Sequence, residues 1–231
     1  MLQVRIGRSN MPRPSVLRFW RFIAVALVVA SFSIFLLQKY SEIISVVTVP
    51  EKLKMEKKTV NPCPTLICSK DHFSFYIQSG AANVVPPKIC FRNQLFLGKE
   101  KQNTGTGINA VILNGTTGEL VHTGYYDMYS GDSKPLIELL QKTETGSIIL
   151  MASFDEPSSK LNEEARQLIL DLGSSSVKSL GFRDNWIFVG GKGLRVKSTF
   201  EKHIKNDPKM NKYETWPELI ELSGCIPKYM S

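Results

Sequence analysis

The chain has 231 residues, which suits one domain with appendages, and its 42% hydrophobic content is ordinary for a globular core. A net charge of +8 often indicates a nucleic-acid partner, but ten basic and three acidic residues give the segment 1–60 a charge of +7. Residues 61–231 therefore carry only +1, which excludes nucleic acid as the expected partner of the folded part.

The first 40 residues have the features of a secretory leader. Five arginines precede an apolar run over residues 22–37, as the charged n-region precedes the h-region of a signal peptide. Val28-Val29-Ala30 offers a small-residue cleavage site. The alternative is an uncleaved signal anchor with its N-terminus in the cytosol, because the arginine excess favours that orientation. A buried core helix is a third interpretation, since the run is slightly short for a membrane span of about 20 residues.

Residues 1–40 are therefore expected to be a signal peptide or a signal anchor, and both place the rest of the chain in the secretory lumen. Residues 41–61 are polar and rich in lysine and show no sustained periodicity, so we expect a linker or stalk there. The globular domain is expected to span residues 62–231. Membrane contact is expected only through the N-terminal segment, if that segment is not cleaved.

Four cysteines lie in the expected domain: Cys63, Cys68, Cys90 and Cys225. An even number of cysteines in a lumenal chain predicts disulfides, with three possible connectivities. A zinc site with four cysteine ligands is the alternative. However, the spacing lacks paired C-x₂-C motifs, and an oxidising compartment favours disulfides over metal binding. We therefore expect two disulfides and no metal.

Several segments have strand patterns. Residues 72–78 alternate between apolar and polar side chains, as in a half-buried strand. Two apolar runs, 107–113 and 119–126, flank a turn that begins with Asn114-Gly115, and Asn-Gly between such runs is a strong hairpin signal. Residues 147–153 are apolar throughout their centre, which suits a strand buried on both faces.

The stretch from Leu180 to Gly193 is the one around which the domain is expected to be organised. Its apolar centre, 186–189, predicts a central strand buried on both faces, on which the flanking helices pack. Val84-Val85 precedes two prolines, so it is expected only at a sheet edge. Residues 218–222 have a further strand-like pattern.

Three helix signals are interleaved with the strands. Ser133 and Pro135 predict the cap and first turn of one helix. Asn162 predicts the N-cap of a second helix, which ends at Gly173. A capping box at 198–201 predicts a third, short helix. Strands and helices together predict an α+β domain.

Six short segments occur along the domain in an order typical of one known family. They are Ser79-Gly80-Ala81-Ala82-Asn83-Val84-Val85, Asn114-Gly115-Thr116-Thr117-Gly118, Tyr126-Asp127-Met128-Tyr129-Ser130-Gly131-Asp132, Asp171-Leu172-Gly173-Ser174, Gly181-Phe182-Arg183-Asp184-Asn185-Trp186, and Trp216-Pro217-Glu218. With these segments, the stretch from about Cys63 to Pro227 resembles the family of interleukin-like EMT inducer and pancreatic-derived factor, the family with sequence similarity three.

The resemblance implies a secreted, cytokine-like signalling protein that acts through a cell-surface receptor. It implies a single compact domain of two small mixed β-sheets flanked by about three helices, with the disulfides Cys63–Cys90 and Cys68–Cys225. A related GG-type lectin-like domain occurs in a glycosyltransferase stem and binds sugar. A carbohydrate-binding module, secreted or held in the Golgi membrane as a type II anchored protein, is therefore the alternative function.

The chain departs from the family pattern at a few positions. Thr106 stands where an arginine is expected, and Thr215 stands where a glycine usually precedes Trp216. Cys63 and Cys68 are one residue closer than the pattern, which puts the first disulfide in doubt. Val189 occupies the position of an extra cysteine found in one branch, so the covalent dimerisation proposed for that branch is not supported here.

No catalytic machinery is expected. His72, His122 and His203 are the three histidines, and none lies in a metal-ligand or nucleophile pattern. The G-x-S-x-G motif is missing, and cysteines held in disulfides cannot act as nucleophiles. We therefore expect neither an enzyme nor a cofactor.

Sugar recognition is the better hypothesis for a small ligand, because sugars bind planar apolar surfaces beside fixed charged groups. Arg183, Asp184 and Trp186 are close in sequence near one end of the expected central strand, and Asp155 follows another strand. These four residues are predicted to form a shallow carbohydrate pocket. The alternative is that Trp186 packs in the core while Arg183 and Asp184 pair with each other or with loops. Asn114 begins an N-glycosylation sequon, although a tight hairpin turn can hinder that modification.

Overall fold

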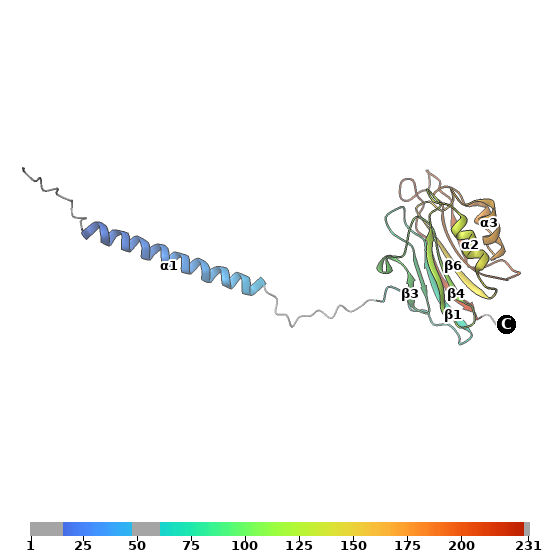
Figure 1. Cartoon of the computed structure of the whole chain (residues 1–231), viewed down its shortest axis with the longest axis horizontal. Coiled ribbons are helices and arrows are strands. Elements are labelled where there is room, and N and C mark those ends of the chain that lie inside the picture. The colour runs from blue at the N-terminus through green and yellow to red at the C-terminus, as the bar shows by residue number, and fades with distance from the viewer. Residues whose placement is uncertain (1–15, 48–60, 229–231) are drawn as a thin grey trace, which may run out of the picture. The chain divides into compact units, whose positions relative to one another are not determined.

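A computed structural model describes residues 16–47 and 61–228, and Figure 1 shows their helices and strands. The first three arginines of the leader, most of the expected linker and the last three residues lie outside the described residues. The chain divides into two compact units, residues 1–59 and 60–231. The domain boundaries expected from the sequence stay predictions.

Helix α1 (Val16–Val47) contains the apolar run of the leader. Its stretch Phe22–Ser41 is 20 residues long with a mean hydropathy of 2.1, and none of it is buried. The interpretation as a buried core helix is therefore wrong.

The stretch Phe22–Ser41 reaches the length of a membrane span, whereas the apolar run over residues 22–37 is shorter than that length. A signal peptide and a membrane anchor both fit this length and composition. The helix also continues past Ser41, where the linker was expected to begin.

A four-stranded sheet forms one face of the domain, and Figure 1 labels its strands β3 and β1. The strand order is β3-β2-β1-β9. The strand predicted over residues 72–78 is confirmed as β1, and its alternating side chains Phe73, Phe75 and Ile77 are buried. The last strand pairs with β1 along its whole length and brings Cys225 into the sheet. The strands are β1 (His72–Gln78), β2 (Lys88–Phe91), β3 (Gln94–Leu97) and β9 (Glu221–Pro227).

A five-stranded sheet lies behind it, in the order β5-β4-β6-β7-β8. The predicted hairpin after Asn114 is confirmed, because β4 and β5 pair on either side of that turn. All named strand pairs in the described chain are antiparallel, where mixed sheets were expected. The strands are β4 (Gly107–Asn114), β5 (Leu120–Tyr126), β6 (Ser147–Phe154), β7 (Asn185–Gly191) and β8 (Glu201–Ile204).

Two α-helices cover the other face of the five-stranded sheet (Figure 1): α2 (Lys134–Lys142) and α3 (Glu163–Asp171). The predicted N-cap of α3 is confirmed, since the Asn162 side chain accepts a hydrogen bond from the Ala165 N–H at 2.9 Å. Ser133 precedes α2 as predicted, but its hydroxyl makes no capping hydrogen bond. Short 3₁₀ turns, η1 (Lys99–Lys101) and η2 (Val177–Ser179), complete the helical elements of the described domain.

The domain thus has three layers and two hydrophobic cores. One core lies between the two sheets, and the other lies between the five-stranded sheet and the helices. Neighbouring residues of the middle layer alternate between them: Leu150 and Ile187 face the first core, while Met151 and Phe188 face the second. This arrangement confirms that β6 and β7 are buried on both faces. It also confirms the α+β fold class.

The third predicted helix is wrong, because residues 198–201 lead into strand β8 instead. The Val189 N–H donates to the Phe200 carbonyl at 2.8 Å, and the Phe200 ring packs edge-on against Phe75 with centroids 5.0 Å apart. Sheet pairing and burial of an aromatic side chain therefore outweigh the local capping signal.

Three other expectations need correction. Strand β7 is buried on both faces as predicted, but β6 is the central strand of the sheet. Val85 forms only an isolated bridge with Ala81 and no edge strand. The last strand begins at Glu221 rather than at Glu218, since its register is set by the pairing with β1.

Two disulfides fasten the ends of the domain to the four-stranded sheet. Cys63 is bonded to Cys90 on β2, and Cys68 is bonded to Cys225 on β9. These pairs are the ones that the family resemblance implies. The second disulfide joins residues 157 positions apart, so the segment before the first strand is tied covalently to the last strand.

Candidate functional site

The candidate site lies at one end of the five-stranded sheet, where β6 ends and β7 begins. Asp155 follows β6 and Arg183 precedes β7, and antiparallel pairing brings these two ends together. Both residues have left-handed backbone conformations, with φ of 59° and 58°. Positive φ is uncommon for residues other than glycine and concentrates at functional sites.

The Arg183 guanidinium contacts two aromatic rings. Its central carbon lies 4.0 Å from the Trp216 ring centroid and 4.9 Å from that of Phe182. One terminal nitrogen donates to the Thr215 hydroxyl at 2.7 Å. The Nε–H of Arg183 is buried, and no acceptor for it exists among the described residues. Because buried donors normally have a partner, this unsatisfied donor marks Arg183 as a candidate binding residue.

Asp155 joins the same group of residues through the indole. The Trp216 Nε1–H donates to Asp155 Oδ1 at 3.2 Å. Phe182 remains 47% exposed, so an apolar surface stays open beside the cation and the carboxylate. The five residues Asp155, Phe182, Arg183, Thr215 and Trp216 are called the Arg183 cluster below.

The structure does not bring together the four residues predicted to form the carbohydrate pocket. Trp186 is fully buried, stacks on Phe188 with centroids 5.6 Å apart, and donates from Nε1 to Glu201 at 2.8 Å. A side chain on a strand that is covered on both faces cannot form a surface platform. Trp186 therefore belongs to the core, as the alternative interpretation stated.

Asp184 is also turned away from the cluster. Its carboxylate accepts from the Gly181 and Asn206 backbone N–H groups, each at 2.7 Å, and lies 2.7 Å from His203 Nε2. Burial alone would raise the pKa of Asp184, but the hydrogen bonds from His203 and the two backbone groups lower it below 3.8. This carboxylate anchors loops and is not free to bind a ligand.

Sequence reasoning missed three members of the cluster, Phe182, Thr215 and Trp216, and the most distant of them in sequence is Trp216. It lies in the long connection between β8 and β9, and nothing in local spacing places it beside Arg183. The available signal was Trp216 beside Pro217, a large aromatic residue in a loop rather than in an apolar run. An aromatic ring and two charged groups do lie together at this site, but the tryptophan is Trp216 and not Trp186.

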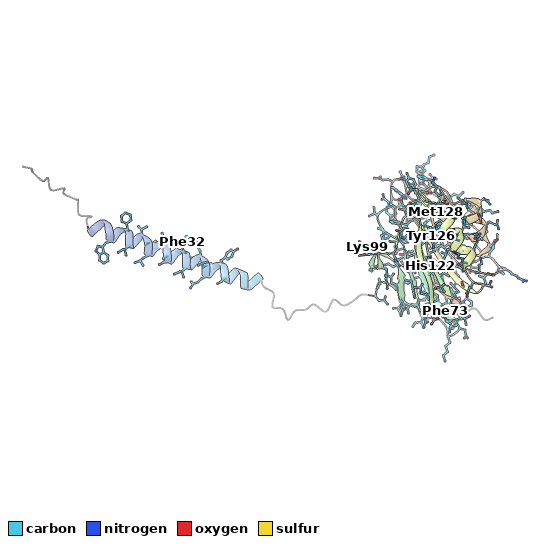
Figure 2. All side chains as sticks on the ribbon, viewed as in Figure 1. Phe32, Phe73, Lys99, His122, Tyr126 and Met128 are labelled. Carbon is cyan, nitrogen blue, oxygen red and sulfur yellow. A yellow bond between two sulfur atoms is a disulfide. The ribbon has the colours of Figure 1, made fainter. Side chains whose placement is uncertain are left out.

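The histidines do not share a site. Figure 2 labels His122 and Tyr126 on β5, where the imidazole Nε2 lies 2.9 Å from the phenol oxygen. His72 contacts Ser69 at 2.7 Å, and His203 contacts Asp184. Within residues 16–47 and 61–228, no group of three His, Cys, Asp or Glu side chains could hold a metal ion.

Asn114 lies at the exposed tip of the β4–β5 hairpin. Its Oδ1 accepts hydrogen bonds from the backbone N–H groups of Thr116 and Thr117, both at 2.9 Å. The sequon asparagine is therefore at the surface, with its side chain held by the turn. Glycosylation of Asn114 stays a prediction.

Comparisons with known proteins agree with the resemblance noted in the sequence. The family model described as interleukin-like EMT inducer matches residues 106–194. Protein FAM3C of Danio rerio is 58% identical over 160 residues, covering 69% of this chain and 70% of that protein. Human Protein FAM3C is 53% identical over 161 residues, covering 70% and 71%. Human Protein FAM3A is 42% identical over 184 residues, covering 80% and 78%. The chain therefore belongs to the family of the interleukin-like EMT inducer.

Proposed function

We propose that this protein is a secreted, cytokine-like signalling protein that acts through a partner on the cell surface. The observation that carries the proposal is the Cys68–Cys225 disulfide, because such bonds persist in oxidising compartments. The apolar helix α1 supports entry into the secretory pathway. The family description, interleukin-like, supports a signalling role rather than a structural one.

The names of the three relatives denote no enzyme, which supports a protein that signals by binding rather than by catalysis. Extracellular release is the proposed location. Retention in the Golgi as a type II membrane protein is the alternative, and it requires α1 to stay uncleaved.

The signalling proposal predicts saturable binding to cells. Full-length chain should be expressed in mammalian cells, and the protein recovered from the medium should be labelled with a fluorophore. We expect cell-surface binding that saturates and is displaced by excess unlabelled protein. Protein reduced and alkylated at its four cysteines is the control and should not compete, because it loses both disulfides. Binding that does not saturate, or that denatured protein displaces equally well, would contradict a specific receptor.

A second candidate function is sugar binding by the Arg183 cluster. It is favoured by the unpartnered Nε–H of Arg183 beside the exposed face of Phe182. Sugars present both hydroxyls and apolar C–H faces, so a guanidinium, a carboxylate and an aromatic ring suit them. Asp155 and Arg183 lie beside the ends of two paired strands, which favours fixed positions for these two charged groups.

This second function predicts that Arg183→Ala weakens glycan binding about 10- to 100-fold, the value of one or two hydrogen bonds to a charged group. Arg183→Lys should recover little, because an ammonium group cannot keep the planar stack on Trp216. Arg195→Ala, at an exposed arginine outside the cluster, is the control. Glycan-array binding would measure these effects. A wild-type protein without sugar preference would remove this function and leave the signalling proposal unaffected.

A further inference from the structure

Two cavities of contrasting character meet at the end of β9, far along the strands from the Arg183 cluster. The first has a volume of about 440 Å³ and is lined by the start of β6, the end of β7, the segment joining β7 to β8, and the end of β9. The second has a volume of about 530 Å³ and is lined by the segment before β1 and by two hairpin turns. Lys228 lines both cavities. Both volumes lie within the usual range for small-molecule sites, about 300–1,000 Å³.

The first cavity is apolar and opens into the core between the two sheets. Ile148 and Val189, which line it, belong to that core and are 5% and 3% exposed. Phe200 adds an aromatic wall. At the rim, Leu194 and Val196 are 41% and 69% exposed. An apolar cavity that continues to exposed apolar side chains at its rim leaves a hydrophobic path from the core to the surface.

The charged residues that line the apolar cavity are Lys192, Lys197 and Lys228, with no carboxylate among them. Lys192 Nζ is held by the Leu140 carbonyl at 2.8 Å. Lys197 and Lys228 have no ion-pair partner within the described part of the chain. Lys228 Nζ lies 5.3 Å from the Phe73 ring centroid, on the side of the second cavity.

The second cavity repeats this charge pattern with a polar lining. Its ionisable residues are Lys70, His72, Arg92 and Lys228, again without a carboxylate. An apolar space and a cationic space therefore adjoin at Lys228. That juxtaposition matches a ligand with an apolar chain and an anionic head.

We propose that the apolar cavity binds the tail of a single-chain anionic amphiphile of the fatty-acid class, with its head group at Lys228. A single chain can reach the buried side chains of Ile148 and Val189, whereas the flat surface of a bilayer cannot. The tail supplies affinity, because burial of each CH₂ group increases the binding constant about fourfold. The cations supply orientation, because the carboxylate head stays where the two cavities meet.

The proposal predicts a strong dependence on chain length and charge. Radiolabelled dodecanoate, below its micelle concentration, should bind one-to-one in equilibrium dialysis to oxidised protein purified after expression of the full chain. Octanoate, with four fewer CH₂ groups, should bind roughly 200-fold more weakly. Uncharged dodecan-1-ol should bind about tenfold more weakly than dodecanoate. Equal binding of octanoate and dodecanoate would overturn the proposal.

Two substitutions locate the site. Val196→Asp, which puts a carboxylate at the apolar rim, should weaken dodecanoate binding at least tenfold. Its matched control is Val121→Asp on β5, which is 62% exposed and outside both cavities. Lys228→Glu should weaken binding about tenfold, and Lys178→Glu, on η2, should not. The substituted positions at 121 and 196 are exposed, so both proteins should keep the wild-type circular dichroism spectrum. Equal effects of Val196→Asp and Val121→Asp, or binding to anionic vesicles without binding of free dodecanoate, would contradict the proposal.

Discussion

Replacing both Cys68 and Cys225 by serine is expected to lower the free energy of unfolding by about 5 kcal/mol. The bond closes a loop of 157 residues, and the chain-entropy relation gives that value for a loop of this length. Because domains are stable by only about 5–15 kcal/mol, the variant should be retained by cells or secreted in low yield. Urea unfolding of purified protein, together with yield in the medium, would measure the effect.

The Cys68–Cys225 disulfide stabilises one particular strand of the fold, β9. Strand β9 lies at the edge of the sheet beside β1, so the disulfide holds this strand against the sheet. The matched control is the serine pair at Cys63 and Cys90, which closes a loop of 27 residues and should cost about 3.5 kcal/mol. A smaller loss for the long loop than for the short one would show that the estimate from loop length does not apply here.

Glu201→Ala is expected to lower the free energy of unfolding by about 3 kcal/mol. The Glu201 carboxylate accepts hydrogen bonds from the Ser174 and Ser175 hydroxyls, from the Ser175 and Ser176 N–H groups, and from Trp186 Nε1. Alanine leaves these donors without their acceptor, and some of them are buried. Glu201→Gln should lose less, since one carbonyl oxygen remains. The control is Glu138→Ala, at an exposed glutamate on α2 whose ion pair with Lys142 is 4.0 Å long.

The same carboxylate predicts a pH dependence. Burial would raise the pKa of Glu201, but the hydrogen bonds from Ser174, Ser175 and Trp186 outweigh it and place the pKa below 4.5. A carboxyl whose pKa is lower in the folded state stabilises the fold fully above its unfolded pKa and loses that contribution as the pH falls through the folded pKa. The stability difference between wild type and Glu201→Ala should therefore be constant at neutral pH and shrink below about pH 4.5. A difference that stayed the same down to pH 3 would contradict this role.

Local signals in the sequence predicted much of the fold. The hairpin after Asn114 and the cap at Asn162 depend on residues a few positions apart, so the sequence contains the whole interaction. The capping box at 198–201 is equally local, yet it failed. The Phe200 ring packs against Phe75 in the core between the sheets. The Glu201 carboxylate accepts more hydrogen bonds from distant residues than it would accept in a capping box. These tertiary contacts outweigh the local helix signal.

The candidate site could be predicted only in part, for a similar reason. Arg183 and Asp155 flank strand ends and were identified from their positions. Trp186 was chosen as the aromatic surface, but a tryptophan within a run buried on both faces belongs to the core. Trp216 lies in the connection between β8 and β9, and its contact with Arg183 depends on how that connection folds. A contact between residues so far apart in sequence cannot be predicted from a local pattern.

The most direct test of an oxidised, extracellular signalling domain is mass spectrometry of the protein made by cells from the full chain, with its N-terminus sequenced. We expect protein in the medium that has lost the N-terminal part of α1, with Cys63 linked to Cys90 and Cys68 linked to Cys225. Cell-retained protein with an intact N-terminus and free thiols would contradict it.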